Sequence, residues 1–224
     1  MTLVTSTRQD GNMGLHVGDD PLHVLANRRR FLTQHALDLN NLIMADQIHG
    51  DHIEIVTSSQ RGYGAMTHTN AIPACDALIT TDPSLILGIV TADCVPIILW
   101  DSTRPLYAAI HAGWKGTAKT ITLKTLQQCR TLGGSLATLH AMIGPAIGAC
   151  CYKVGEATAT ACGCEGDASL DLQHLNYRQL IQEGLDPSHI TIDKTCTSCH
   201  HDRYFSYRAD QGQTGRMLTI ITSQ

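Results

Sequence analysis

Short apolar segments rich in β-branched residues recur along the whole chain, and this pattern restricts the fold more than any other feature of the sequence. Each segment has the length of a strand and is bounded by turn-forming residues, so the pattern favours strands over helices. The predicted strands cover residues 3–7, 41–49, 53–57, 76–81, 85–91, 96–100, 106–112, 138–144, 189–193 and 217–222.

Helical patterns are fewer. The segment 20–37 has apolar residues at roughly helical spacing and begins with Asp20 as an N-cap and Pro21 at the first helical position. The segment 114–134 is amphipathic and ends in a glycine pair that suits a C-cap. A third helix is expected over 175–185. Many strands with interspersed helices predict an α+β or layered α/β fold.

The composition bounds the architecture and the partners. With 224 residues, 43% of them hydrophobic and no linker or repeat, the chain is expected to form a single domain over residues 1–224. The net charge of −4 and the lack of basic clusters apart from Arg28–Arg30, which we interpret as a solvated helix face, argue against nucleic-acid binding. The longest apolar run is interrupted by Asp93, so no membrane span is expected. The chain starts without a secretory-signal pattern, which predicts a cytoplasmic protein.

The nine cysteines and twelve histidines favour thiols and metal ligands over a disulfide framework. Three of these residues lie at predicted strand ends beside small or turn-forming neighbours, namely His49, Cys94 and His111. Two imidazoles and one thiolate suit zinc, and three protein ligands leave the fourth tetrahedral position open. Each residue alone also fits a packed thiol or a hydrogen-bonded imidazole, so the spacing by itself leaves both interpretations open.

Several motifs occur in a fixed order: Gln47-Ile-His-Gly50, Cys75-Asp-Ala-Leu-Ile-Thr80, Thr91-Ala-Asp-Cys-Val-Pro96, His111-Ala-Gly-Trp-Lys-Gly116 and Ile143-Gly-Pro-Ala-Ile-Gly148. In these motifs the sequence resembles the laccase-domain or polyphenol oxidase family, also described as bacterial purine nucleoside phosphorylases and as peptidoglycan editing factors. Shorter matches extend the resemblance over nearly the whole chain, at residues 6–8, 18–21, 27–30, 196–197, 205–208 and 214–217.

The resemblance implies a four-layer αββα sandwich of mixed sheets, with zinc held by His49, Cys94 and His111. The implied activity is phosphorolysis of adenosine and related purine nucleosides to the base and ribose 1-phosphate, with adenosine deamination as a companion reaction. The older description of the family is a copper-dependent oxidase of polyphenols, so copper is the alternative metal. The expected partners are a purine nucleoside and phosphate, and the expected assembly is a monomer or a homodimer.

Some positions depart from the family pattern. The glycine-rich loop before Gly18 is shortened, and the segment 156–173 is short. Ala149 stands where a proline commonly occurs, Lys153 replaces a glutamate, and Ala209 replaces the second arginine of the F-S-Y-R-R pattern. These departures concern substrate preference more than the metal site.

Phosphorolysis needs an anion pocket, and four residues are candidates for it. Arg8 and Lys115 are predicted to bind phosphate as cations on loops, with Lys115 also assigned to the catalytic set. The backbone at Gly144 and Gly148 would let N–H groups approach an anion closely. Lys115 equally fits a solvated residue in a first helical turn. Asp93 is interpreted as structural or as a support for the ligands, since in an extended strand it would point away from Cys94. A bulge before Pro96 would bring both into one pocket, so a role in proton transfer is left open.

Other functions use the same residues. A cysteine hydrolase that edits peptidoglycan precursors would employ Cys94 as its nucleophile and His111 as its base. A zinc-binding module without catalysis is a further alternative. A trinuclear copper centre is disfavoured because the chain has no H-x-H pair.

The remaining cysteines also leave alternatives open. Cys196 and Cys199 form a C-x-x-C pair that suits half of a structural zinc site, with Cys162 and Cys164 as candidate partners, or a redox pair or free thiols. We favour free thiols for this pair. The pair Cys150-Cys151 is interpreted as packed rather than reactive.

Overall fold

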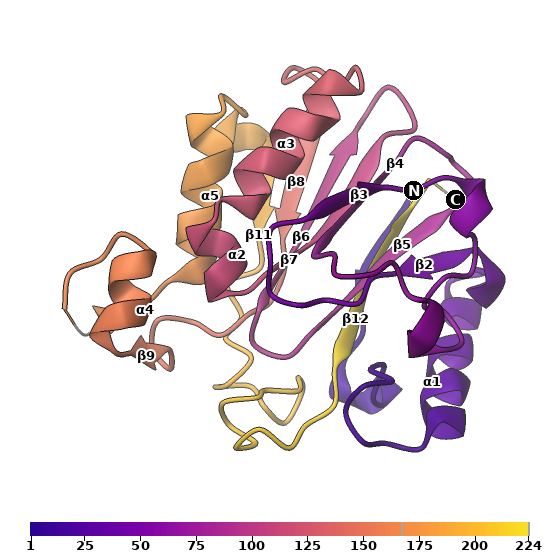
Figure 1. Ribbon diagram of the computed structural model, residues 1–224, viewed down its shortest axis with the longest axis horizontal. Helices are drawn as coiled ribbons and strands as arrows, with labels where there is room; N and C mark the ends of the chain where they lie inside the picture. Colours follow the sequence, from indigo (N-terminus) through magenta and orange to yellow (C-terminus); the bar gives the residue numbers. More distant parts are fainter. Residues whose placement is uncertain (167, 224) are drawn as a thin grey trace.

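Two mixed β-sheets form the centre of the computed structural model, which describes residues 1–166 and 168–223 (Figure 1). The first sheet has four strands in the order β1 (Thr2–Thr5), β12 (Met217–Thr222), β5 (Ile86–Thr91) and β2 (Leu42–Met44). The second has six strands in the order β11 (Ile190–Ile192), β8 (Leu139–Ile143), β6 (Val95–Asp101), β7 (Tyr107–Ala112), β4 (Ala77–Thr80) and β3 (Ile53–Ile55). Because β1 pairs with β12, the two ends of the chain lie side by side.

The sheets pack face to face because their strands alternate. In β6, Ile98 packs with residues of the four-stranded sheet such as Leu87 and Ile89. Its neighbours Ile97 and Leu99 instead join the core on the other face of the six-stranded sheet. This period of two is what a strand with both faces buried requires.

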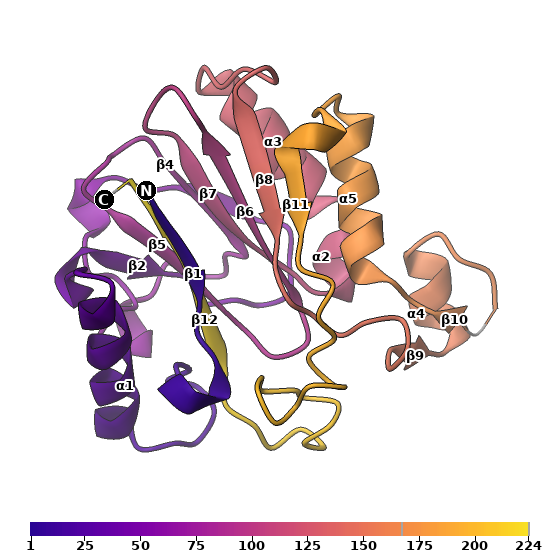
Figure 2. The same cartoon turned by 180° about the vertical axis from the view of Figure 1, so that it is seen from behind.

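Helices cover the two outer faces (Figure 2). On the six-stranded sheet lie α2 (Trp114–Ala118), α3 (Ile121–Thr131) and α5 (Leu172–Gln182), and on the four-stranded sheet lies α1 (Pro21–Gln34). The predicted αββα sandwich is therefore confirmed. At one end project α4 (Glu156–Ala161) and the short antiparallel strands that flank it in the chain, β9 (Lys153–Val154) and β10 (Ala168–Ser169), which the sequence did not predict. Short 3₁₀ turns cover Arg8–Asp10, Leu39–Asn41, Ser58–Gln60, His68–Asn70 and Pro187–His189. No helix in the described part of the chain is long and apolar enough to cross a membrane.

Some predicted boundaries were wrong. The helix expected over 114–134 is two helices, because Thr120 adopts a left-handed conformation with φ of 60° and breaks the hydrogen-bond ladder. The third helix begins at Leu172, where the side chain of Asp171 accepts a hydrogen bond from the His174 N–H. The strand expected over 41–49 ends at Met44. The residues after it form a loop that carries His49.

The chain crosses from one sheet to the other directly after β5. Residues 92–94 form a tight turn between β5 of the four-stranded sheet and β6 of the six-stranded sheet. Asp93 in this turn has a φ of 84°. Cys94 therefore lies in a turn that joins the two sheets, and this explains two hydrophilic residues inside an apolar run.

Arg28 is a correction to the sequence prediction. Its side chain is 2% exposed, although the arginine cluster was interpreted as a solvated face. The guanidinium donates hydrogen bonds to the carbonyls of Met13, Gly64 and Ala65 at 2.7–2.9 Å. It thus ties α1 to two loops, and burial lowers its pKa to about 10.

Arg28→Met should destabilise the protein by about 2–4 kcal/mol, because three buried carbonyls lose their donors. Arg29→Met, at the neighbouring exposed position, should change the free energy of unfolding by less than about 0.5 kcal/mol. Urea unfolding of both variants measures the difference. Equal stability of the two would show that the Arg28 hydrogen bonds contribute little.

Candidate metal centre

His49, Cys94 and His111 converge from three separate parts of the fold. They lie on the loop after β2, in the turn between the sheets and on β7. Their ligand atoms all lie within 4.8 Å of one another, and the two imidazole rings meet edge to face with centroids 4.7 Å apart. The structure thus brings together the three residues predicted as metal ligands, in an arrangement that can hold a metal ion.

A buried carboxylate organises this cluster. Asp76 Oδ1 lies 2.7 Å from His111 Nδ1, and the side chain is fully buried. The same carboxylate accepts hydrogen bonds from the backbone N–H groups of His49 and Gly50 at 3.0 and 2.6 Å. Because Nδ1 of His111 is engaged, Nε2 is the nitrogen left for a metal, as in other carboxylate–histidine–metal arrangements.

The electrostatics favour the metal-binding form of the thiol. Burial alone would raise the pKa of Cys94, but the adjacent His111 and His49 outweigh it and lower that pKa to about 6. Burial likewise opposes the charged form of His111, while the Cys94 thiolate and Asp76 raise its pKa to about 9. Asp76 has a lowered pKa, because the His111 and backbone hydrogen bonds outweigh its burial. A thiolate is the ligand form of cysteine, and His111 releases its proton when it binds a metal.

Residues next to the three candidate ligands hold their loops in position around the cluster. The Gln47 side chain exchanges two 2.8 Å hydrogen bonds with the backbone of Val90, so it acts as a strand partner at the end of β5. His49 then turns with φ of 60° while Asp76 holds its N–H. A Cβ at Gly113 would lie 3.0 Å from both Cys94 Sγ and His49 Cδ2, so a larger residue there would crowd the cluster.

Asp93 has a structural role in the fold. Its carboxylate accepts hydrogen bonds from the Thr197 hydroxyl at 2.7 Å and from the Arg208 N–H at 2.6 Å. Its carbonyl accepts from the Ile147 N–H at 2.9 Å. Asp93 thus joins the turn between the sheets to the loop of Ile147 and to the loop that carries Thr197 and Arg208.

The cluster lies in the wall of a cavity of about 590 Å³. Aromatic side chains of Trp114, Tyr152 and Tyr207 line it together with the cations of Lys115, Arg208 and Arg216. Its size and mixed lining are typical of a small-molecule site.

Two further polar side chains line the same cavity. Burial and the nearby Arg216 lower the pKa of His16 to about 4, so this imidazole is neutral at neutral pH. In the described part of the chain, the Thr91 hydroxyl is buried without a hydrogen-bond partner. Neither residue was a candidate from the sequence, because His16 lies in none of the quoted motifs and the hydroxyl of Thr91, although within the 91–96 motif, was given no role.

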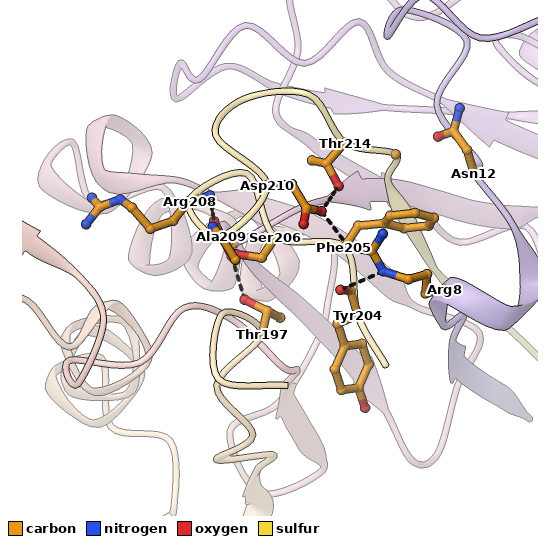
Figure 3. A network of polar contacts seen from close by, with 12 residues as sticks. Arg8, Asn12, Thr197, Tyr204, Phe205, Ser206, Arg208, Ala209, Asp210 and Thr214 are labelled. Carbon is orange, nitrogen blue, oxygen red and sulfur yellow. Dashed lines mark hydrogen bonds and ion pairs between the residues drawn. The ribbon is translucent and has the colours of Figure 1, made fainter. Parts of the chain in front are cut away.

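The four residues predicted to bind phosphate do not all line the cavity. Lys115 lines the cavity, whereas Arg8, Gly144 and Gly148 do not. The Arg8 guanidinium pairs with Asp210 and lies 4.6 Å from the centre of the Phe205 ring (Figure 3). The phosphate role of Arg8 therefore stays a prediction for substitution to test.

Both glycines have their N–H groups engaged by protein atoms. The Gly144 N–H donates to the Pro96 carbonyl at 2.8 Å, and a Cβ at Gly144 would lie 2.8 Å from the Pro96 ring. The Gly148 N–H donates to Cys196 Sγ at 3.2 Å. The structure therefore gives a packing reason for the glycine at 144 and a sulfur contact at 148.

Comparison with known proteins assigns the chain to a family. The family model described as "Multi-copper polyphenol oxidoreductase laccase" matches residues 4–224. The chain belongs to this family. The resemblance predicted from the motifs is thereby confirmed.

Relatives within the family carry other functional names. "Purine nucleoside phosphorylase YlmD" of Geobacillus stearothermophilus is 38% identical over 226 residues, which cover 94% of this chain and 82% of the relative. "Adenosine deaminase RL5" from an unknown prokaryotic organism is 30% identical and covers 94% of this chain and 86% of its own. The crystal structure of YlmD from G. stearothermophilus superposes with a TM-score of 0.94 at 36% identity, over 99% of this chain and 91% of that one. These names support an enzyme of this kind.

Asp76→Asn should weaken the affinity of the cluster for added Zn²⁺ by about 10- to 100-fold, since the amide no longer holds His111 in place as a charged acceptor. Asp82→Asn, at the opposite end of β4, is the matched control and should leave that affinity unchanged. Competition with a chromophoric chelator measures both. Unchanged affinity in Asp76→Asn would show that His111 orients without this carboxylate.

Proposed function

We propose that this protein is a zinc-dependent purine nucleoside phosphorylase that converts adenosine and phosphate to adenine and ribose 1-phosphate. The observation that carries the proposal is the convergence of His49, Cys94 and His111 in a cavity lined by aromatic and cationic side chains. The names of its relatives agree with it, one as a purine nucleoside phosphorylase and one as an adenosine deaminase.

The donor set favours zinc. Two imidazoles and one thiolate match the ligands of catalytic zinc sites, and a cluster with two histidines lacks the ligands that a multinuclear copper centre needs. An ion held by these three side chains would supply Lewis-acid chemistry to a bound substrate.

The cavity suits both substrates. Trp114, Tyr152 and Tyr207 offer flat surfaces on which a purine can stack. Lys115, Arg208 and Arg216 supply positive charge for phosphate. In phosphorolysis a phosphate oxygen bonds to C1′ as the bond from C1′ to the purine nitrogen breaks. The cations hold the nucleophile, while the aromatic wall holds the departing base.

Arg216 is the best-placed of these cations for an anion. It is half-buried, and its Nη1 donates to the Thr214 and Gly215 carbonyls at 2.8 and 3.0 Å, which fixes the guanidinium in the wall. Burial lowers its pKa, yet an arginine stays charged at neutral pH. Arg208 is exposed and is engaged with the carbonyls of Cys151 and Lys153.

Adenosine deamination is the second candidate function, and the relative named adenosine deaminase favours it. Both reactions start from the same bound nucleoside. They differ in product, since deamination yields inosine and ammonia without phosphate, whereas phosphorolysis yields adenine and requires phosphate. A cysteine hydrolase would instead need Cys94 as a free nucleophile, which bound zinc would protect from alkylation.

Purified protein with adenosine and phosphate should release adenine. His49→Ala, Cys94→Ala and His111→Ala should each lose one zinc per chain and lower the activity by more than about 100-fold. Substitution of a residue that only hydrogen-bonds to a metal ligand already lowers metal affinity or activity by about 10- to 100-fold, and loss of the ligand itself should lower it further. His52→Ala, at an exposed histidine near the cluster, is the control and should keep both. Full turnover in a variant without metal would refute the zinc mechanism, and release of inosine alone would favour deamination.

Arg216→Ala should raise the KM for phosphate by about 10- to 100-fold, the loss expected for a charge-assisted hydrogen bond. Arg8→Ala should leave this KM within about twofold, because Arg8 lies outside the cavity lining. The substitution removes only the partly exposed ion pair with Asp210, which joins two loops. Steady-state kinetics with varied phosphate compare the two. The reverse result would assign the phosphate contact to Arg8.

A further inference from the structure

A second group of metal-competent side chains lies outside the cavity lining. The sulfur atoms of Cys150, Cys151, Cys196 and Cys199 all lie within 4.8 Å of one another. Cys199 Sγ lies 3.5 Å from Cys150 Sγ and 3.4 Å from Cys151 Sγ. The sequence offered Cys162 and Cys164 as partners for the C-x-x-C pair, but the fold supplies Cys150 and Cys151 instead.

The spacing of the sulfurs fits tetrahedral coordination. Zinc–sulfur bonds of about 2.3 Å place the four sulfurs of a tetrahedral site about 3.8 Å apart. A disulfide needs a single pair at about 2.05 Å. Cys199 is almost equally far from two partners and pairs with neither, so four sulfurs around one centre describe the cluster better than one cross-link.

The backbone around the cluster is shaped for thiolates. The N–H group of Gly148 donates to Cys196 Sγ at 3.2 Å. A Cβ at Gly148 would lie 3.2 Å from Cys196 Cβ and 3.3 Å from Cys150 Sγ, so glycine leaves the sulfurs room to gather. Hydrogen bonds from backbone N–H groups are the outer contacts that orient and stabilise metal-bound thiolates.

We infer that Cys150, Cys151, Cys196 and Cys199 form a structural zinc site. Four thiolates close the coordination sphere, so the site stabilises the fold and leaves no open position for a substrate. Cys150 and Cys199 are exposed, which lets the ion load from solution. The inference stands on the cysteines alone and does not depend on the proposed reaction.

The site would join two loops that build the cavity wall. Ile147 and Tyr152 flank the Cys150-Cys151 pair, and Tyr207 and Arg208 follow the C-x-x-C pair. The Cys151 carbonyl accepts a hydrogen bond from Arg208 Nη1 at 3.0 Å, which is a second link between the same loops. A zinc ion here fixes the position of the wall from outside the reaction site.

The test is the zinc content of the intact protein, purified under reducing conditions with zinc. The wild type should hold two ions per chain. Cys199→Ser and Cys150→Ser should each hold one, with a lower melting temperature. Cys164→Ser, a half-buried cysteine outside the cluster, is the matched control and should hold two.

His49→Ala isolates the proposed site, since it removes a ligand of the other cluster and leaves all four cysteines. This variant loaded with Co²⁺ should show the intense thiolate-to-metal charge-transfer absorption of a tetrahedral four-cysteine site, and it stays informative if a cysteine variant fails to fold. No metal on His49→Ala would overturn the inference. So would an intact mass of the wild type that is two hydrogens lighter than the reduced chain, because the sulfurs would then form a disulfide. If the triad binds no zinc, the wild type and His49→Ala hold one ion each, and the four-cysteine site still stands.

Discussion

The buried carboxylate of Asp76 is the interaction on which the centre depends. It accepts the N–H groups of His49 and Gly50 and the Nδ1 of His111, so one side chain fixes the loop after β2 against β7. A buried negative charge costs free energy unless it is paired and hydrogen-bonded, and here each of these contacts offsets that cost. The imidazole of His111 and the backbone of the loop that carries His49 are thereby held before any metal binds.

The turn between the sheets supplies the third ligand. The chain passes from β5 to β6 within residues 92–94, and Asp93 anchors this turn to the loops that contain Thr197 and Arg208. Cys94 is therefore placed by the junction of the two sheets and by the contacts of its neighbour Asp93 with Ile147, Thr197 and Arg208. The loop after β8, whose Ile147 N–H donates to the Asp93 carbonyl, carries Cys150 and Cys151, and the segment with Thr197 and Arg208 carries Cys196 and Cys199. Both segments contribute to the cavity wall, so the two candidate metal sites belong to one connected end of the sandwich.

Most strands could be predicted because they follow from local periodicity. The αββα architecture was implied by the family resemblance of the ordered motifs and not by periodicity. The errors have local physical causes. Thr120 breaks a helical pattern through a left-handed backbone that composition does not reveal. Arg28 lies on a charged run but finds buried carbonyls on loops distant in sequence, which periodicity cannot show. The phosphate candidates are a separate case: they were chosen by charge and by glycine content, Lys115 lines the cavity, and the phosphate role of all four stays a prediction.

From the sequence came most of the strands, the approximate positions of the main helices and the identity of the residues able to bind a metal, since alternation and side-chain chemistry are local properties. Tertiary structure alone decided that Asp76 orients His111, that Arg216 rather than Arg8 lines the cavity, and that Cys150 and Cys151 meet Cys196 and Cys199. These contacts join segments tens of residues apart, and their geometry exists only after the two sheets have packed and the loops at their junction have closed together.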